Sequence, residues 1–390
     1  MASAKVVIEN LFKIFDPRPA DALALLRQGV DKDRVVAQTG KMVGVNDVSL
    51  SVNEGEIFVL MGLSGSGKST LVRMINRLLD PSDGKIFVDG VDIAKLGAKQ
   101  LQRLRRRDMS MVFQSFALLP HRSVLDNAAF GLELAGVARR EREARAASVL
   151  EQVGLGPYAR KYPHELSGGM QQRVGLARAL AVNPSLMLMD EAFSALDPLK
   201  RKQMQELLLG LQSAQRRTIV FVSHDLEEAL RIGNRIAIME GGRLIQVGTP
   251  QELIDKPAGE VVRAYFDSVD TSRFLVAAYL LCGTGIPLLV RGRAQGVLPA
   301  WQPWLAMVDA DGKWVGMVSA EHLNGGANVQ QALRPEHATV PAGTCLRVLL
   351  PQLMRQSAPL AVLDGDGSYL GVITAASALR KLSLGAHHAA

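Results

Sequence analysis

The 390-residue sequence lacks several features that define whole classes of protein. Its two cysteines, Cys282 and Cys345, are too few for a disulfide framework and are not spaced as metal ligands, so we expect packing roles in a reducing compartment. The longest uncharged stretch, Phe274 to Val290, is shorter than the roughly 20 residues of a membrane-spanning helix and contains glycine and proline. We predict buried strand and helix there. The amino terminus lacks the pattern of a secretory signal, which favours a cytosolic protein.

The composition is that of a folded, soluble protein. About half of the residues are apolar (48%) and 21% are charged, and the length favours two domains or one domain with a large appendage. The net charge of +7 is spread along predicted helices, which is more typical of a solvated surface than of a nucleic-acid site. The densest basic cluster is Arg103, Arg105, Arg106 and Arg107; it forms either an exposed helix face or a contact with phosphate or lipid.

Short apolar runs without alternation predict the central strands of an α/β sheet. These runs are Ile57–Met61, Leu186–Met189 and Thr218–Val222, and each is followed directly by glycine or polar residues. Open parallel sheets bind ligands beyond the carboxyl ends of their strands, so we expect the site there. The remaining pattern predicts strands at 5–15 and 43–52, a hairpin at 235–240 and 243–247, and helices at 22–26, 124–135, 141–152 and 201–213.

The segment after the first of these strands is a complete phosphate-binding loop. It consists of Gly62, Leu63, Ser64, Gly65, Ser66, Gly67, Lys68, Ser69 and Thr70. It follows a predicted strand and opens a predicted helix, as the motif requires. Backbone N–H groups and the helix amino terminus would surround the phosphates, Lys68 would reach the β and γ phosphates, and Ser69 would ligate Mg²⁺. The sequence therefore predicts that ATP and Mg²⁺ bind here.

Polar residues also follow the other two strands. Asp190 ends an apolar strand, where it can hold the magnesium shell, and the adjacent Glu191 is placed to polarise an attacking water as a general base. His224 follows the third strand at the same sheet edge. These positions predict one cluster of catalytic side chains beside the phosphate loop.

A second phosphate-binding surface is predicted at the start of another helix. It comprises Ser167, Gly168, Gly169, Met170 and Gln171. A serine hydroxyl and glycine amides at a helix start suit phosphate, yet one nucleotide does not need two such surfaces. In a head-to-tail homodimer, Ser167 of one copy would close over the γ phosphate held by Lys68 of the other. ATP would then stabilise the dimer and hydrolysis would release it.

From Lys5 to about Asp267 the sequence resembles an ABC ATPase, because these motifs occur in the family's order and approximate spacing. The resemblance implies a P-loop NTPase fold with a mainly parallel sheet, an antiparallel β subdomain and a helical subdomain. It implies that Gln114 senses the γ phosphate and the permease contact and is a metal ligand, and that residues Leu166–Gln171 form the signature. It also implies that Glu191 is the catalytic base, Asp197 the D-loop residue and His224 the switch histidine. An aromatic ring commonly stacks on adenine in this family. Thr39 falls near that position here, and core packing is favoured for Phe12 and Phe15, so the adenine contact stays unassigned.

Segments 62–77, 166–178 and 189–199 resemble the family's glycine betaine and proline branch. The resemblance implies an ATP hydrolase that energises import of such osmoprotectants at the cytoplasmic face of the inner membrane. Its partners would be a second copy of the chain, an integral-membrane permease subunit and, indirectly, a substrate-binding protein, with no nucleic acid. Another solute such as choline stays an alternative, because specificity lies in other subunits. A non-transport ABC protein is disfavoured by the single phosphate loop.

An internal repeat follows the predicted ATPase domain. Residues 305–320 match 360–375, and each copy is a strand, an Asp-x-Asp-Gly turn, a strand and a helix start. So short a unit cannot bury its apolar face alone, so the copies should pack as one module. The repeat resembles a tandem CBS pair with a regulatory or dimer-bracing role, but the acidic residue expected for adenosine binding is absent. We predict an ATPase domain at 1–268, this module at 269–384 and a tail at 385–390.

Overall fold

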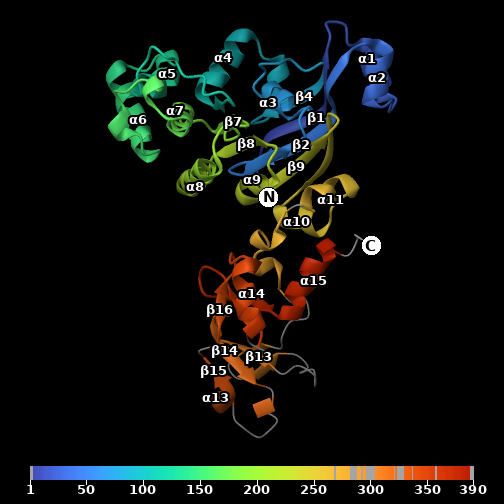
Figure 1. Cartoon of the computed structure of the whole chain (residues 1–390), viewed down its shortest axis with the longest axis vertical. Helices are drawn as coiled ribbons and strands as arrows, with labels where there is room; N and C mark the ends of the chain where they lie inside the picture. The colour runs from blue at the N-terminus through green and yellow to red at the C-terminus, as the bar shows by residue number, and fades with distance from the viewer. Residues whose placement is uncertain are drawn as a thin grey trace. The chain divides into compact units, whose positions relative to one another are not determined.

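The computed structural model forms two compact units, which are described separately (Figure 1). The first comprises residues 1–250 and 258–262, and the second comprises 251–257 and 263–390. The structure describes residues 3–267, 269–281, 288–290, 293–295, 304–319, 321–322, 329–335, 337–355 and 358–386. Within these residues no helix is both long and apolar enough to cross a bilayer.

A six-stranded sheet forms the centre of the first unit, in the order β10-β9-β3-β8-β7-β6. Its strands are β3 (Ile57–Met61), β6 (Met109–Val112), β7 (Leu186–Asp190), β8 (Thr218–Ser223), β9 (Arg235–Glu240) and β10 (Arg243–Gly248). All neighbours pair in parallel except β9 and β10, which form the predicted hairpin. Every residue of β3, β7 and β8 is buried, which confirms the prediction of central strands.

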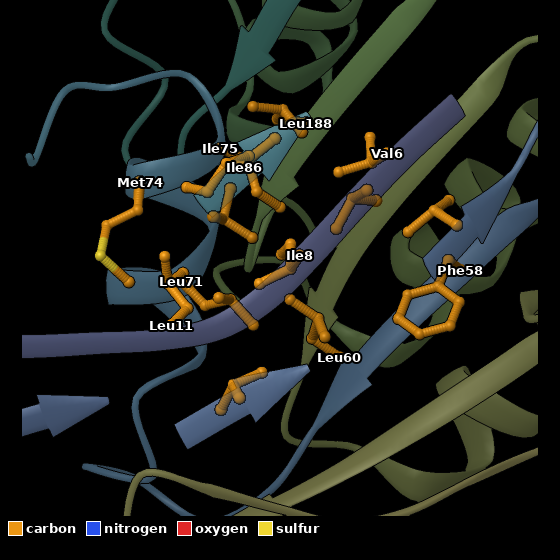
Figure 2. Packing of buried hydrophobic residues seen from close by; sticks show 14 of the residues in the cluster. Val6, Ile8, Leu11, Phe58, Leu60, Leu71, Met74, Ile75, Ile86 and Leu188 are labelled. Atoms are coloured by element: carbon orange, nitrogen blue, oxygen red, sulfur yellow. The ribbon is translucent and has the colours of Figure 1, made fainter. Parts of the chain in front are cut away.

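A second sheet is antiparallel and packs against the phosphate-loop helix. It has the order β2-β1-β4-β5, formed by β1 (Ala4–Phe15), β2 (Met42–Asn53), β4 (Asp83–Val88) and β5 (Val91–Asp92). Figure 2 shows Ile8 and Leu11 of β1, Leu60 of β3, and Leu71 and Met74 of α3 (Lys68–Ile75) in one buried cluster. Burying a side chain of this size stabilises a fold by roughly 1.5–3 kcal/mol. This core fixes α3, and with it the phosphate loop, between the two sheets.

The helices predicted at 124–135, 141–152 and 201–213 are present in the first unit. Its helices after α3 are α4 (Ala98–Arg107), α5 (Val124–Leu134), α6 (Arg139–Gln152), α7 (Gly168–Ala181), α8 (Pro198–Ala214) and α9 (Leu226–Ile232). Residues 251–255 of α10 (Pro250–Asp255) belong to the second unit, and α11 (Glu260–Phe266) is divided between the units after residue 262. α5, α6 and α7 pack on one another as a helical subdomain. The antiparallel sheet and this subdomain confirm the predicted fold class.

The basic cluster of α4 divides into two parts. Arg105 donates hydrogen bonds to the main-chain oxygens of Asn76 and Arg77, at the end of α3, so its role is structural. Arg103, Arg106 and Arg107 are exposed, as expected of a solvated helix face.

The insertion between β1 and β2 contains two helices where the sequence predicted one. These are α1 (Ala20–Arg27) and α2 (Lys32–Thr39), whose buried residues pack on Phe12, Ile14 and Val43. The prediction missed α2 because Val35 is its one buried residue, so the helix shows little apolar periodicity. Its ends carried the clearer signal: the Asp31 side chain caps the start, and Gly40 ends the helix in the left-handed conformation.

The second unit contains two further sheets. One has the order β12-β11-β13-β14-β15 and the other β16-β17-β18. Their strands are β11 (Leu288–Val290), β12 (Arg293–Gln295), β13 (Trp304–Val308), β14 (Trp314–Ser319), β15 (Leu333–Arg334), β16 (Thr339–Pro341), β17 (Leu360–Leu363) and β18 (Tyr369–Ile373). The described helices include α13 (Val329–Ala332), α14 (Leu346–Arg355) and α15 (Ala375–Ala386). Cys345 is free and partly buried, whereas Cys282 lies outside the described residues.

The two copies of the repeat pack against each other, as predicted. The main-chain N–H of Trp314 donates to the Gly367 oxygen, and that of Tyr369 donates to the Gly312 oxygen, so equivalent positions exchange equivalent bonds. The rings of Trp314 and Tyr369 stack with centroids 5.5 Å apart. The repeat therefore forms one module around a local two-fold relation.

Candidate nucleotide site

The phosphate loop connects β3 to α3 and depends on two glycines. Gly67 caps α3 at φ +97°, and a Cβ there would lie 2.4 Å from the Gly44 oxygen. A Cβ on Gly62 would lie 2.2 Å from the Met239 oxygen. A Cβ atom essentially never comes this close to a carbonyl oxygen, so a larger residue at either position would displace the loop. The sequence thus places glycine where the backbone approaches its neighbours most closely.

Lys68 lies inside this loop and is only 4% exposed. Its Nζ donates to the main-chain oxygens of Gly62 and Leu63, each at 2.8 Å. Burial lowers the pKa of Lys68, while the nearby carboxylates of Glu191 and Asp190 oppose that shift. A phosphate anion entering the loop would supply the charge partner that a buried ammonium requires.

Oxygen donors from α3 and β7 meet beside the loop. The Ser69 hydroxyl donates to Asp190 Oδ1 at 2.6 Å, and Arg73 Nη2 donates to Oδ2 at 3.1 Å. Asp190 is 3% exposed, so its carboxylate is held in one position. A hydroxyl and a carboxylate are the hard oxygen ligands that Mg²⁺ prefers, so these residues fit the predicted metal.

Glu191 is the point at which the other predicted catalytic side chains converge. Gln114 Nε2 donates to Glu191 Oε2 at 3.2 Å, and His224 Nδ1 lies 3.5 Å from the same oxygen. The Glu191 backbone adopts φ +48°, which is uncommon for a residue other than glycine. Ser194 stabilises this conformation, because its main-chain N–H and its hydroxyl both donate hydrogen bonds to the main-chain oxygen of Glu191. A strained, buttressed backbone of this kind is frequent at functional sites.

The predicted signature and D-loop residues lie on two other helix starts. Ser167 caps α7 and accepts a bond from the Met170 N–H, Gly168 and Gly169 form its first turn, and Gln171 Nε2 donates to the Pro163 oxygen. Asp197 caps α8 by accepting from the Lys200 N–H at 3.0 Å. Ser167, Gly168 and Asp197 are exposed or half-exposed, so a second molecule can reach them.

The structure distinguishes the candidates for an adenine contact. The Thr39 hydroxyl is used to hydrogen-bond the Val35 oxygen, and Phe12 is 4% exposed in the core. Phe15, by contrast, is 44% exposed at the end of β1, so the core packing expected for it is wrong, and its ring lies beside Gly44. This exposure could not be predicted from the sequence, because it depends on how β1 packs beside Gly44 of β2.

Six of the predicted residues thus meet at one edge of a parallel sheet, five of them as their positions after the predicted strands implied and Gln114 as the family resemblance implied. They are Lys68, Ser69, Asp190, Glu191, His224 and Gln114. The site combines a loop shaped for phosphate, an oxygen site for a hard cation and a carboxylate beside them. These features define the class of the protein, which is a P-loop ATPase.

Comparison with known proteins identifies the family within this class. The family model "ABC transporter" matches residues 45–194. The chain is 48% identical to the glycine betaine/proline betaine transport system ATP-binding protein of Escherichia coli, with 97% of each chain covered. It is 44% identical to the glycine betaine/carnitine transport ATP-binding protein of Listeria monocytogenes, with 97% of this chain and 98% of that protein covered. The chain therefore belongs to the ABC transporter family, among its ATP-binding subunits.

Solved structures agree with this assignment. A bacterial ABC transporter cassette, determined as a dimer, is 30% identical and superposes with a TM-score of 0.54, covering 63% of this chain and 98% of that one. The same cassette has been solved in a post-hydrolysis state bound to ADP and Pi, with the same similarity. The protein accordingly binds and hydrolyses ATP as a subunit of a transporter.

Proposed function

We propose that this chain energises import of glycine betaine, proline betaine or a related quaternary amine. The supporting observation is the extent of the similarity. Relatives named for glycine betaine transport match over 97% of this chain, including its second unit. A relative named for trimethylamine N-oxide transport, from Ruegeria pomeroyi, is equally identical at 48% but matches over only 74%. The full-length match favours the betaine branch over its neighbour.

In this proposal Ser69 and Asp190 hold Mg²⁺ and Lys68 binds the β and γ phosphates. Bound magnesium neutralises charge that develops on the phosphate oxygens. Glu191 accepts the proton of the attacking water, and Gln114 and His224, which contact its carboxylate, orient that water and the γ phosphate. The half-exposed ring of Phe15 stacks on adenine.

Two copies of the chain would meet head to tail around ATP. The exposed residues at the start of α7, Ser167 and Gly168, would cover the γ phosphate of the opposite copy, with Asp197 nearby on α8. The dimer would work on the cytoplasmic face of the membrane with a permease and a substrate-binding protein. The second unit would act as a CBS-like regulatory module, since its paired repeat has the corresponding strand and helix order.

The test is reconstitution of the chain with its permease in vesicles, with labelled solute and internal ATP. We expect uptake of glycine betaine and proline betaine, with choline and proline as competitors. Uptake must require ATP and must be lost in Lys68→Ala. ATP-dependent uptake of a different solute, with no betaine uptake, would contradict the proposed substrate but not the ATPase assignment.

A further inference from the structure

A buried polar cluster lies behind the turn that carries His224. Its centre is Glu228 on α9, which is 6% exposed and follows the histidine by one helical turn. The Glu228 Oε2 atom lies 2.6 Å from the Ser223 hydroxyl, and Oε1 accepts a bond from Gln205 Nε2 at 3.1 Å. Ser223 and Gln205 are 2% and 6% exposed. The carboxyl group therefore joins β8, α8 and α9 inside the protein.

Both residues that flank His224 belong to this cluster. The Ser223 hydroxyl accepts from the Asp225 N–H at 3.0 Å, and Asp225 Oδ1 in turn accepts from the Glu228 N–H at 3.1 Å. The His224 side chain itself is 52% exposed and faces Glu191. Its position is therefore set by the backbone of the turn, and the turn is held by buried groups on either side.

The same cluster includes side chains of α8, the helix that Asp197 caps. Arg201 Nη1 donates to Asp225 Oδ2 at 3.0 Å, while Arg201 Nη2 donates to the Leu196 oxygen at 3.3 Å. Gln205 lies one turn further along α8. The histidine turn and the segment that precedes Asp197 are thus fixed to a common set of side chains.

We propose that Glu228 is a positioning residue for ATP hydrolysis, which orients the turn bearing His224 and couples it to the start of α8. This inference rests on the proposed role of His224. Glu228 touches neither nucleotide nor water, and acts through Ser223 and Asp225. Its loss would free the histidine to leave Glu191 without altering the phosphate loop.

The arrangement of donors favours a protonated Glu228. A neutral carboxyl group can donate to the Ser223 hydroxyl. That hydroxyl is then free to donate its own proton to the main-chain oxygen of Asp225 at 3.2 Å. An ionised Glu228 carboxylate would instead accept the hydrogen bond of the Ser223 hydroxyl, and the main-chain oxygen of Asp225 would lose that donor. Burial raises the pKa of Glu228, and the Asp225 carboxylate adds to this shift; the bonds from Ser223 and Gln205 and the Arg201 charge oppose it.

The experiment compares Glu228→Gln with Glu228→Ala in the purified full-length chain. The amide of glutamine imitates the neutral acid, so Glu228→Gln should keep ATP turnover within about twofold of wild type. Glu228→Ala removes the acceptor of the buried Gln205 amide and the partner of the Ser223 hydroxyl, so it should lower kcat about tenfold or more, with the KM for ATP nearly unchanged. Glu206→Gln is the matched control, because Glu206 joins the same two helices through an exposed ion pair with Arg231 at 3.1 Å.

The pH profile separates positioning from general destabilisation. Wild-type turnover should decline as the pH rises through the raised pKa of Glu228, and Glu228→Gln should lose this decline while keeping the acidic limb. Equal loss of kcat in both variants, or a wild-type profile in Glu228→Ala, would overturn the inference. His224→Ala tests the underlying role: if it is inactive while Glu228→Ala is normal, the positioning inference alone fails. If His224→Ala is fully active, the proposed role of the histidine fails.

Discussion

Phe15 allows a quantitative test of how the site holds adenine. Its ring lies beside Gly44, with Lys13 Nζ 5.5 Å from the ring centroid, and is 44% exposed, so this exposed area is the most that a base can cover. A phenylalanine buries about 200 Å² when fully covered, so stacking would remove about 90 Å² from water. At about 25 cal/mol per Å² this contributes about 2 kcal/mol, in the range measured for stacking of a base on an aromatic side chain. Phe15→Ala should therefore weaken nucleotide binding about 30-fold.

Titration calorimetry with ADP and with pyrophosphate isolates this contribution. Pyrophosphate fills the phosphate loop but has no base, so Phe15→Ala should weaken ADP binding and leave pyrophosphate binding unchanged. Phe15→Trp should restore ADP affinity. Tyr158→Ala, which removes another exposed aromatic ring (41%), is the control. If Phe15→Ala weakened both ligands equally, or neither, the adenine assignment would be refuted.

Further predictions concern the catalytic base, the loop and Glu228. Glu191→Gln should lower ATP turnover about 10²- to 10⁴-fold, and size-exclusion chromatography should show an ATP-bound dimer; undiminished turnover would remove Glu191 from its role. Gly67→Ala should abolish nucleotide binding because its Cβ would strike the Gly44 oxygen, whereas Gly90→Ala, with open space around it, should retain binding. In the folded state the pKa of Glu228 is raised above its ordinary value of 4.5, so the carboxyl group keeps its proton to higher pH than in the unfolded chain. The free energy of unfolding of the wild type should therefore fall, relative to that of Glu228→Gln, as the pH rises from 4.5 through the raised pKa. Urea unfolding over a pH series that starts near 4.5 measures this, and a difference in stability that does not change with pH would contradict it.

The residues that could be predicted from the sequence are those whose chemistry is carried by contiguous segments. Gly62 to Thr70 is a loop that can be recognised without its neighbours, and Asp190 and His224 follow strands that are apolar enough to be assigned as central. Once three such strands are parallel, their carboxyl ends must meet at one edge. The meeting of Gln114 and His224 at Glu191 is the outcome of that topology.

The residues that escaped prediction owe their roles to contacts between distant elements. Phe15 has an ordinary place at the end of an apolar strand, and only the structure shows that its ring lies beside Gly44 and stays 44% exposed. Helix α2 was missed for a different reason: one buried valine is enough to hold it, because α1 covers the rest of the same small core.

Glu228 combines both difficulties. Near the polar start of α9 a glutamate is expected to be solvated, since it favours the helix amino terminus. Here the short α9 is turned so that this carboxyl points inward to Ser223 and Gln205, and burial changes which protonation state the surroundings favour. The environment of this carboxyl group depends on how β8, α8 and α9 pack together, which the sequence around Glu228 does not indicate. The residues of a P-loop site that stand in contiguous motifs can therefore be inferred from the sequence, whereas a buried group such as Glu228, which joins three elements, emerges only from the packed structure.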